Sequence, residues 1–253
     1  MADCGAGYAS SALLCWYYNC ARSNCVNATL AVAQQVTNPV ANFPADNNGV
    51  LIELPALPAS GASAVTGTMT FGIGSQSNNL LGSATVLKSN SSTGYVSTTM
   101  NGSAYSSSFL DSGSNGLFFP PATLTVCGAW YCPSSTQSFT ATITSTTGTS
   151  VDVGFSIGQS TALFAIGNYA FNNLAGSVSG YFDWGLPFFF GCRVFRGARR
   201  TRAADGRRTV LRVLTRLEWK KPSRRRDGFH ACMTSSAYWP AALLSSSNIF
   251  CAR

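Results

Sequence analysis

Asp111 is the residue whose surroundings first suggest acid–base chemistry. It lies in the stretch FLDSGSNGLFF (Phe109–Phe119), which places one acidic residue between two apolar runs. A carboxylate at the mouth of a buried strand destabilises a fold unless it is hydrogen-bonded. Asp-Ser-Gly is also a sequence that favours a turn by itself. These residues alone therefore leave two interpretations open, a catalytic carboxylate and a structural turn aspartate.

The cysteines suggest a second kind of chemistry, disulfide formation. Six of the nine cysteines lie before residue 133, at short spacings in a chain rich in Ser, Thr and Asn. This pattern is typical of exported proteins with disulfides. The pairs that we expect are Cys20–Cys25, Cys127–Cys132 and, from what remains, Cys4–Cys15. Buried free thiols are the alternative interpretation.

Other classes of protein are disfavoured by composition. The early cysteines form no CxxC pair and His230 is the only histidine, so we expect no metal site and no other cofactor. No apolar run approaches the ~18 residues that a transmembrane helix needs. The opening MADCGAGYAS lacks the basic end and the long apolar run of a signal peptide.

The net charge of +8 is concentrated at one end of the chain. Residues 1–191 carry two basic and six acidic side chains, a net charge of −4, whereas residues 192–253 carry fifteen basic and three acidic ones, a net charge of +12. Such a change marks either a basic appendage or a stretch that does not belong to the fold.

The elements that must position Asp111 are short strands. Alternating segments separated by Gly, Asn and Ser turns fill residues 49–191, and no helical periodicity is sustained over three turns before residue 192. This pattern predicts an all-β domain. The segments expected to be strands include GVLIEL, TGTMTFGIG, ATVL, GYVSTTMNG, YSSSFL, SFTATITS and SVDVGFSIG.

Three longer blocks carry a family resemblance. They are QQVTNPVANFPADNNGVLIELPALPASGA, FLDSGSNGLFF and FNNLAGSVSGYFDWGLPFFFG. In this order they resemble a family of largely uncharacterised exported bacterial proteins, which in turn resembles the pepsin-like aspartic peptidases. The resemblance runs from about Asp3 to about Gly191. It implies one lobe of a pepsin-like acid-protease fold.

The resemblance also implies roles for individual residues. FLDSGS resembles the active-site loop of the second lobe, with Asp111 as one catalytic carboxylate. Gly113 would let the backbone turn tightly and bring amides close to that carboxylate. The hydroxyls of Ser112 and Ser114 would fix the loop by donating hydrogen bonds.

A second segment, FDWGLPFFF, resembles the apolar-apolar-Gly segment that braces this loop from beneath. Within and beside it, Trp184, Gly185 and Gly116 are implied to support the loop.

The sequence departs from the peptidase pattern in one respect. Acid-peptidase chemistry needs a second carboxylate about 3 Å away, so that the pair shares one proton and activates a water. The triplets at Asp3, Asp152 and Asp183 have the form Asp-X-Gly but lack Ser or Thr in the middle. In relatives of the resembled family the first aspartate lies in an upstream lobe, so we expect this chain to be a truncated second lobe whose export signal preceded it.

The basic end allows a further interpretation. Thr209–Thr215 can be encoded ACC GTA CTT CGC GTT CTG AC, which one base later reads Pro-Tyr-Phe-Ala-Phe-stop. Ala204–Arg208 can likewise encode Pro-Thr-Gly-Gly-Gly in the shifted frame. Members of the resembled family are expected to end with a Gly-rich turn and G-P-Y-F-A-F. We therefore predict that the chain is out of frame from near Phe195 onward.

These observations predict three segments. Residues 1–48 are a cysteine-stapled opening segment from the end of a missing first lobe, residues 49–191 are the β lobe with the D-S-G-S loop, and residues 192–253 are a basic, poorly ordered, non-native tail.

Three functions are compatible with the sequence. The favoured one is a second lobe of an aspartic peptidase homologue, inactive by itself, whose parent acts on a protein or peptide. The second is a non-catalytic exported β-rich binding module or envelope lipoprotein in which Asp111 is structural. The third is a cationic protein that binds through residues 192–226. A frame change removes the third, so no nucleic-acid partner is expected, and the parent is expected to be periplasmic, envelope-anchored or extracellular.

Overall fold

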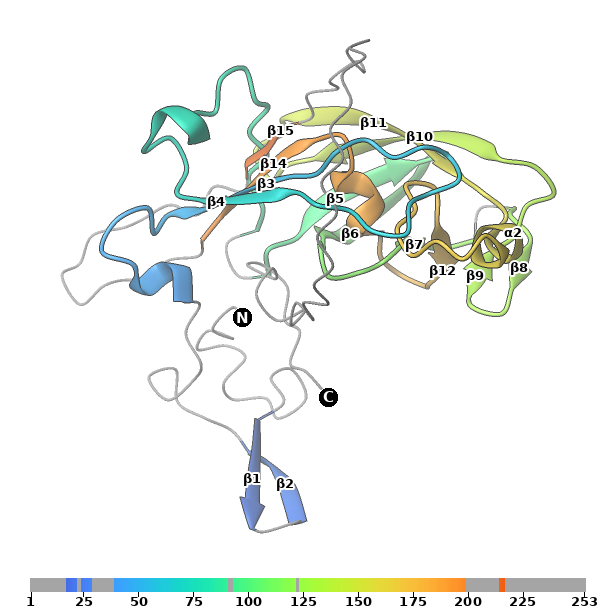
Figure 1. Ribbon diagram of the computed structural model, residues 1–253, viewed down its shortest axis with the longest axis horizontal. Helices are drawn as coiled ribbons and strands as arrows, with labels where there is room; N and C mark the ends of the chain where they lie inside the picture. The colour runs from blue at the N-terminus through green and yellow to red at the C-terminus, as the bar shows by residue number, and fades with distance from the viewer. Residues whose placement is uncertain are drawn as a thin grey trace.

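The computed structural model describes residues 17–21, 24–28, 39–90, 93–121, 123–198 and 214–216. These residues form three sheets of nine, four and two strands (Figure 1). The prediction of an all-β fold is confirmed.

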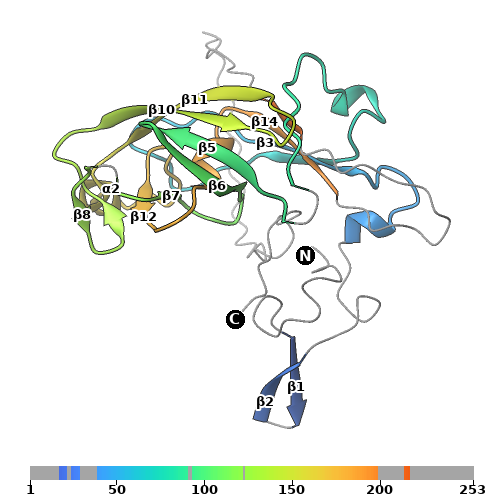
Figure 2. The ribbon, with the colours of Figure 1, turned by 180° about the vertical axis from the view of Figure 1, so that it is seen from behind.

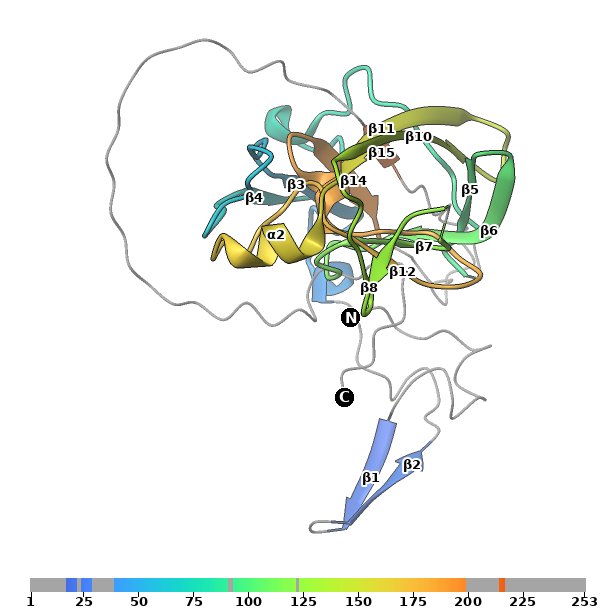
Figure 3. The same ribbon diagram turned by 90° about the vertical axis from the view of Figure 1, so that its right-hand side faces the viewer.

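The largest sheet contains the strands around Asp111. Across the sheet the order is β11-β10-β5-β6-β13-β7-β12-β9-β8. Seen from behind, β5 and β6 run alongside β10 and β11 (Figure 2). From the side, the sheet curls from β10 and β11 through β5 and β6 to β7 and β12 (Figure 3). Its strands are β5 (Val96–Met100), β6 (Ser103–Leu110), β7 (Leu117–Phe119), β8 (Val126–Cys127), β9 (Trp130–Tyr131), β10 (Gln137–Thr144), β11 (Ser150–Ile157), β12 (Ala175–Ser177) and β13 (Asp183–Trp184).

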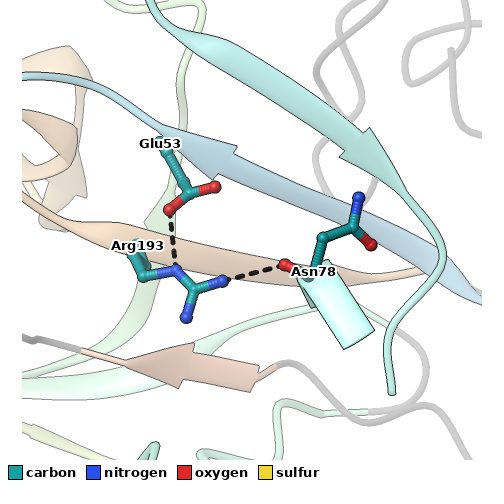
Figure 4. Close-up of polar contacts among 3 residues, drawn as sticks. All are labelled: Glu53, Asn78 and Arg193. Atoms are coloured by element: carbon teal, nitrogen blue, oxygen red, sulfur yellow. Dashed lines mark hydrogen bonds and ion pairs between the residues drawn. The ribbon is translucent and has the colours of Figure 1, made fainter. Parts of the chain in front are cut away.

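The four-stranded sheet has the order β15-β14-β3-β4. Its two central strands pair antiparallel and are joined by an ion pair, in which Arg193 Nε donates to Glu53 Oε1 at 2.7 Å while Arg193 Nη2 donates to the Asn78 carbonyl at 3.1 Å (Figure 4). The strands are β3 (Gly49–Glu53), β4 (Thr68–Phe71), β14 (Arg193–Gly197) and β15 (Leu214–Arg216). The sheet therefore includes residues beyond position 191.

The two-stranded sheet is a hairpin of β1 (Tyr17–Ala21) and β2 (Asn24–Ala28). It is closed by a Cys20–Cys25 disulfide, and a second disulfide joins Cys127 to Cys132. The prediction of these two locally closed pairs is confirmed. The expected Cys4–Cys15 pair lies outside the described residues.

One strand expected from the sequence does not form. The strand expected over ATVL (84–87) is absent, although Leu87 is fully buried there. Only Val86 forms a β-bridge there, and Ala84 and Val86 instead pack against the small core cluster of Leu51, Ile73 and Phe195. The helical elements of the described residues are α2 (Ser160–Ala165) and the 3-10 turns η2 (Pro39–Asn42), η3 (Ser77–Asn79) and η4 (Leu186–Phe189).

One hydrophobic core joins the two larger sheets. Ile52 from β3 and Val194 from β14 belong to the same cluster as Trp184 from β13. Aromatic rings run through this core, with the Phe182 ring 4.9 Å from that of Phe119 and 4.3 Å from that of Trp184. The segment before and within β13 is thus the centre of the packing, which makes its position resistant to displacement.

We expect Trp184→Ala to lower the free energy of unfolding by about 3–5 kcal/mol. The indole is fully buried, stacks on Phe182 and donates its Nε1–H to Thr98 Oγ1 at 2.9 Å. Chemical denaturation measures the loss. Tyr169→Ala is the matched control, because Tyr169 is 82% exposed and its removal should change stability by less than about 0.5 kcal/mol. Equal effects of the two changes would contradict the central role of β13.

Candidate acid site

Asp111 is positioned by a strand that passes between two others. β6 ends at Leu110, immediately before Asp111, and the chain returns as β7. β13 lies between them, parallel to β6 and antiparallel to β7. The loop at residues 111–116 must therefore cross over β13. Two backbone hydrogen bonds fix this crossing, from the Asp111 N–H to the Trp184 carbonyl at 3.0 Å and from the Leu186 N–H to the Ser114 carbonyl at 2.7 Å.

The crossing is possible because two glycines meet there. A Cβ on Gly185 would lie 2.0 Å from the Gly116 carbonyl oxygen and 2.9 Å from that of Ser114. A Cβ on Gly116 would lie 2.9 Å from the Trp130 ring. A side chain at Gly185 would push the loop away from the strand beneath it, and one at Gly116 would collide with the Trp130 ring, since real Cβ contacts are longer than these.

The loop folds back onto the Asp111 carboxylate. Asp111 Oδ1 accepts the Gly113 N–H at 2.8 Å, and Oδ2 lies 3.0 Å from the Ser114 hydroxyl oxygen. The carboxylate is only 2% exposed, beneath the exposed Gly113. Both oxygens thus have a donor close by, which offsets the loss of hydration on burial.

Asp183 reaches the same hydroxyl from below. Ser114 Oγ lies 2.7 Å from Asp183 Oδ2, whereas Asp183 Oδ1 is buried with no hydrogen-bond partner. Burial raises the pKa of Asp183 to about 7; the Ser114 hydrogen bond opposes the rise and the charge of Asp111 adds to it. The site therefore contains two carboxyl groups joined by one hydroxyl.

A buried cation lies near this pair. Arg196 is 3% exposed and belongs to β14. Burial lowers the pKa of Arg196 to about 10, while the charge of Asp111 raises it. A guanidinium at this pKa stays protonated at neutral pH, so a positive charge interacts with Asp111 in the buried interior.

The structure brings together most of the residues that the sequence singled out. Asp111, Gly113 and Ser114 form one hydrogen-bonded loop, and Gly116 and Gly185 form its crossing with the strand below. Trp184 points away from the loop into the core, where it contacts Thr98. Ser112 is half-buried in the loop. The disulfide cysteines Cys20, Cys25, Cys127 and Cys132 form separate bridges.

Two residues of the site are not predicted by the sequence. Asp183 stands out there only as an Asp-X-Gly triplet without Ser or Thr, and Arg196 falls in the segment predicted to be a tail. A charged residue inside the apolar run YFDWGLPFFF is a usable signal, because a carboxylate in such a run must find a donor. Arg196 gives no comparable signal among its many basic neighbours.

The described residues contain no group of three or more His, Cys, Asp or Glu side chains close enough to hold a metal ion. The chemistry that this arrangement supports is proton binding and hydrogen bonding by carboxyl groups.

The chain belongs to the family described as "Protein of unknown function (DUF3443)", whose match covers residues 1–210. No curated protein matches it. Membership confirms the expectation of an uncharacterised family. The matched region includes the loop, the strand beneath it and β14.

We expect Gly185→Ala to destabilise the fold by about 1–3 kcal/mol, since the new methyl group would overpack the crossing. Gly154→Ala is the matched control, because a Cβ at Gly154 meets nothing within 4 Å. Thermal and chemical unfolding of the two variants measure the difference. A tolerated Gly185→Ala would show that the loop and β13 do not lie at contact distance.

Proposed function

We propose that this chain is the second lobe of an aspartic-peptidase-like protein and contributes one catalytic carboxylate, Asp111. The hydrogen bonds to that carboxylate carry the proposal. A backbone N–H at Gly113 and a hydroxyl at Ser114 hold it from within a D-S-G-S loop. The strand from FDWGLPFFF runs directly beneath, as the resemblance implies for the bracing segment.

Among the described residues, the lobe does not contain the facing pair of carboxylates that acid hydrolysis requires. In such a pair the two groups face each other across a water, which one deprotonates while the other protonates the leaving amine. Asp183 does not complete the pair in this structure, because the Ser114 hydroxyl lies between the two carboxyl groups. Asp183 is also 4% exposed and lies on the inner side of the loop. The second carboxylate would come from another lobe of the parent, and the substrate would be a protein or peptide.

One observation favours a second candidate, a non-catalytic exported β module or envelope lipoprotein. Asp111 is 2% exposed and accepts hydrogen bonds from Gly113 and Ser114 of its own loop, so the carboxylate also serves as a structural turn residue. The two candidates differ in the upstream part of the parent. A D-T-G or D-S-G triplet after an apolar strand there supports the peptidase-like function, and its absence supports the binding module.

The compartment is part of the same proposal. Two disulfides indicate an extracellular or periplasmic protein, and among the described residues no helix is long and apolar enough to cross a membrane. We place the parent in the periplasm, at the envelope or outside the cell.

A change of reading frame near Phe195 belongs to the proposal as well. In support, residues 204–208 and 209–215 can encode Pro-Thr-Gly-Gly-Gly and Pro-Tyr-Phe-Ala-Phe-stop in the shifted frame. We expect the genomic DNA to show a single-base insertion or deletion near codon 195. The family match extends to residue 210, and an intact frame through that point would refute the frame change.

We expect the purified chain to cleave no unfolded protein between about pH 3 and 6, the range in which acid dyads work. Asp183 lies behind the Ser114 hydroxyl, so among the described residues Asp111 has no partner with which to share a proton directly. The assay uses an unfolded protein substrate, with Asp111→Ala as the control. Cleavage by the chain that vanishes in Asp111→Ala would show that this lobe is active by itself, for instance as a two-fold dimer.

A complete parent gene supplies the positive test. If its upstream region encodes the partner aspartate, the full protein should cleave at acid pH, and Asp111→Asn in it should lower kcat by at least about 10²-fold. Full activity of Asp111→Asn would leave the binding module as the function.

A further inference from the structure

The Ser114 hydroxyl lies close to two acceptors but can donate a hydrogen bond to only one of them. Its oxygen lies 3.0 Å from Asp111 Oδ2 and 2.7 Å from Asp183 Oδ2. A hydroxyl has one proton to donate and can otherwise only accept. If both carboxyl groups were ionised, one of these short contacts would join two oxygens with no proton between them. Both contacts are hydrogen bonds only when one carboxyl group carries a proton and donates it to Ser114 Oγ.

The surroundings decide which carboxyl group holds that proton. Asp111 has a second donor, the Gly113 N–H, on its other oxygen. The other oxygen of Asp183 is buried without any partner. An ionised carboxylate is stabilised by donors and destabilised by unpaired burial, so the negative charge belongs on Asp111 and the proton on Asp183.

The neighbouring titratable groups support the same assignment. Arg196 on β14 interacts with the charge of Asp111. Tyr181, two residues before Asp183, has its pKa raised by burial first and then by the charges of Asp183 and Tyr95, so it stays neutral at every pH at which Asp183 titrates. With the proton on Asp183, the buried group of Arg196, Asp111 and Asp183 has no net charge, which is the least costly state in a buried site.

We propose that Asp183 is a positioning residue. It keeps its proton and donates it to the Ser114 oxygen, and this directs the Ser114 hydroxyl to donate to Asp111. The proton order is Asp183 carboxyl to Ser114 oxygen, then Ser114 hydroxyl to Asp111 carboxylate. This inference does not depend on the proposed peptidase-like function, since it concerns the loop of this chain alone.

The arrangement makes the loop sensitive to pH. Asp183 in the folded chain has a pKa of about 7, whereas an aspartate in the unfolded chain has a pKa of about 4. Between these values the folded state binds one proton more than the unfolded state, so stability falls as pH rises through this window and levels off above it. Above it, two carboxylates compete for one hydroxyl, and the Ser114 donor to Asp111 is no longer fixed.

The direct test is a pH titration of the aspartate side-chain carboxyl carbons by NMR, on the full chain with ¹³C-labelled aspartate. Through-bond correlation assigns each carboxyl to its own backbone amide, so the wild-type chain is sufficient. We expect the Asp183 carboxyl to titrate with a midpoint near pH 7 and the Asp111 carboxyl to show a smaller step at the same midpoint, as the Ser114 hydroxyl reorients. An Asp183 midpoint below about 5, or a high midpoint that belongs to Asp111 instead, would overturn the proposal.

Variants separate positioning from mere packing. In Asp183→Asn the amide donates permanently to Ser114, so the Asp111 step should vanish and the folding equilibrium constant should lose its fall of about tenfold per pH unit between roughly pH 4.5 and 6.5. Asp152→Asn is the matched control, because Asp152 is an exposed aspartate that also accepts a hydrogen bond from a hydroxyl, that of Thr142 at 2.6 Å. This change should leave the Asp111 step and the pH dependence of folding as in the wild type. Asp183→Ala also removes the titrating group but donates nothing to Ser114, so it should be less stable than Asp183→Asn. A pH dependence that persists in Asp183→Asn would contradict the proposal.

Discussion

The passage of β13 between β6 and β7 is the constraint on which the rest of the structure depends. Side chains of a strand point alternately to opposite faces, so the two residues of β13 serve two different parts of the protein. Trp184 enters the core and reaches Thr98, while Asp183 reaches the Ser114 hydroxyl in the loop. One short strand thereby links the packing of the interior to the hydrogen bonding of the candidate site. The glycine that follows it lets the two chain segments cross at contact distance.

The polar cluster illustrates how a buried site can carry ionisable groups without a large loss of stability. Each member alone would be unfavourable in the interior, since an isolated buried charge is strongly destabilised. The cluster combines a guanidinium, one carboxylate, one neutral carboxyl group and a hydroxyl, which together satisfy most of one another's hydrogen bonds and balance the charge. The unpartnered Asp183 Oδ1 is the exception, and a neutral carboxyl oxygen tolerates this better than an ionised one. The geometry of the cluster therefore determines its protonation.

The sequence predicts the outer parts of this arrangement better than its centre. Alternating segments such as SFTATITS and SVDVGFSIG form the paired strands β10 and β11 because half-buried antiparallel strands require that alternation. The D-S-G-S loop can be found from its residue types. β13 cannot be found in this way, because a two-residue strand buried on both sides leaves no periodic pattern. Nor can β14, whose partner β3 is far away in the sequence and whose basic residues resemble a tail.

The pairing of β3 with β14 also bears on how the chain folds. The ion pair between these strands joins residues 140 positions apart, so this part of the core closes only after nearly the whole described chain has been synthesised. Contacts at such separation slow folding, because the entropy of closing a long loop is lost before any contact compensates for it. Until β14 is made, β3 can pair only with β4, and its other edge stays unpaired. That delay leaves the unpaired strand edge vulnerable to aggregation for as long as synthesis continues.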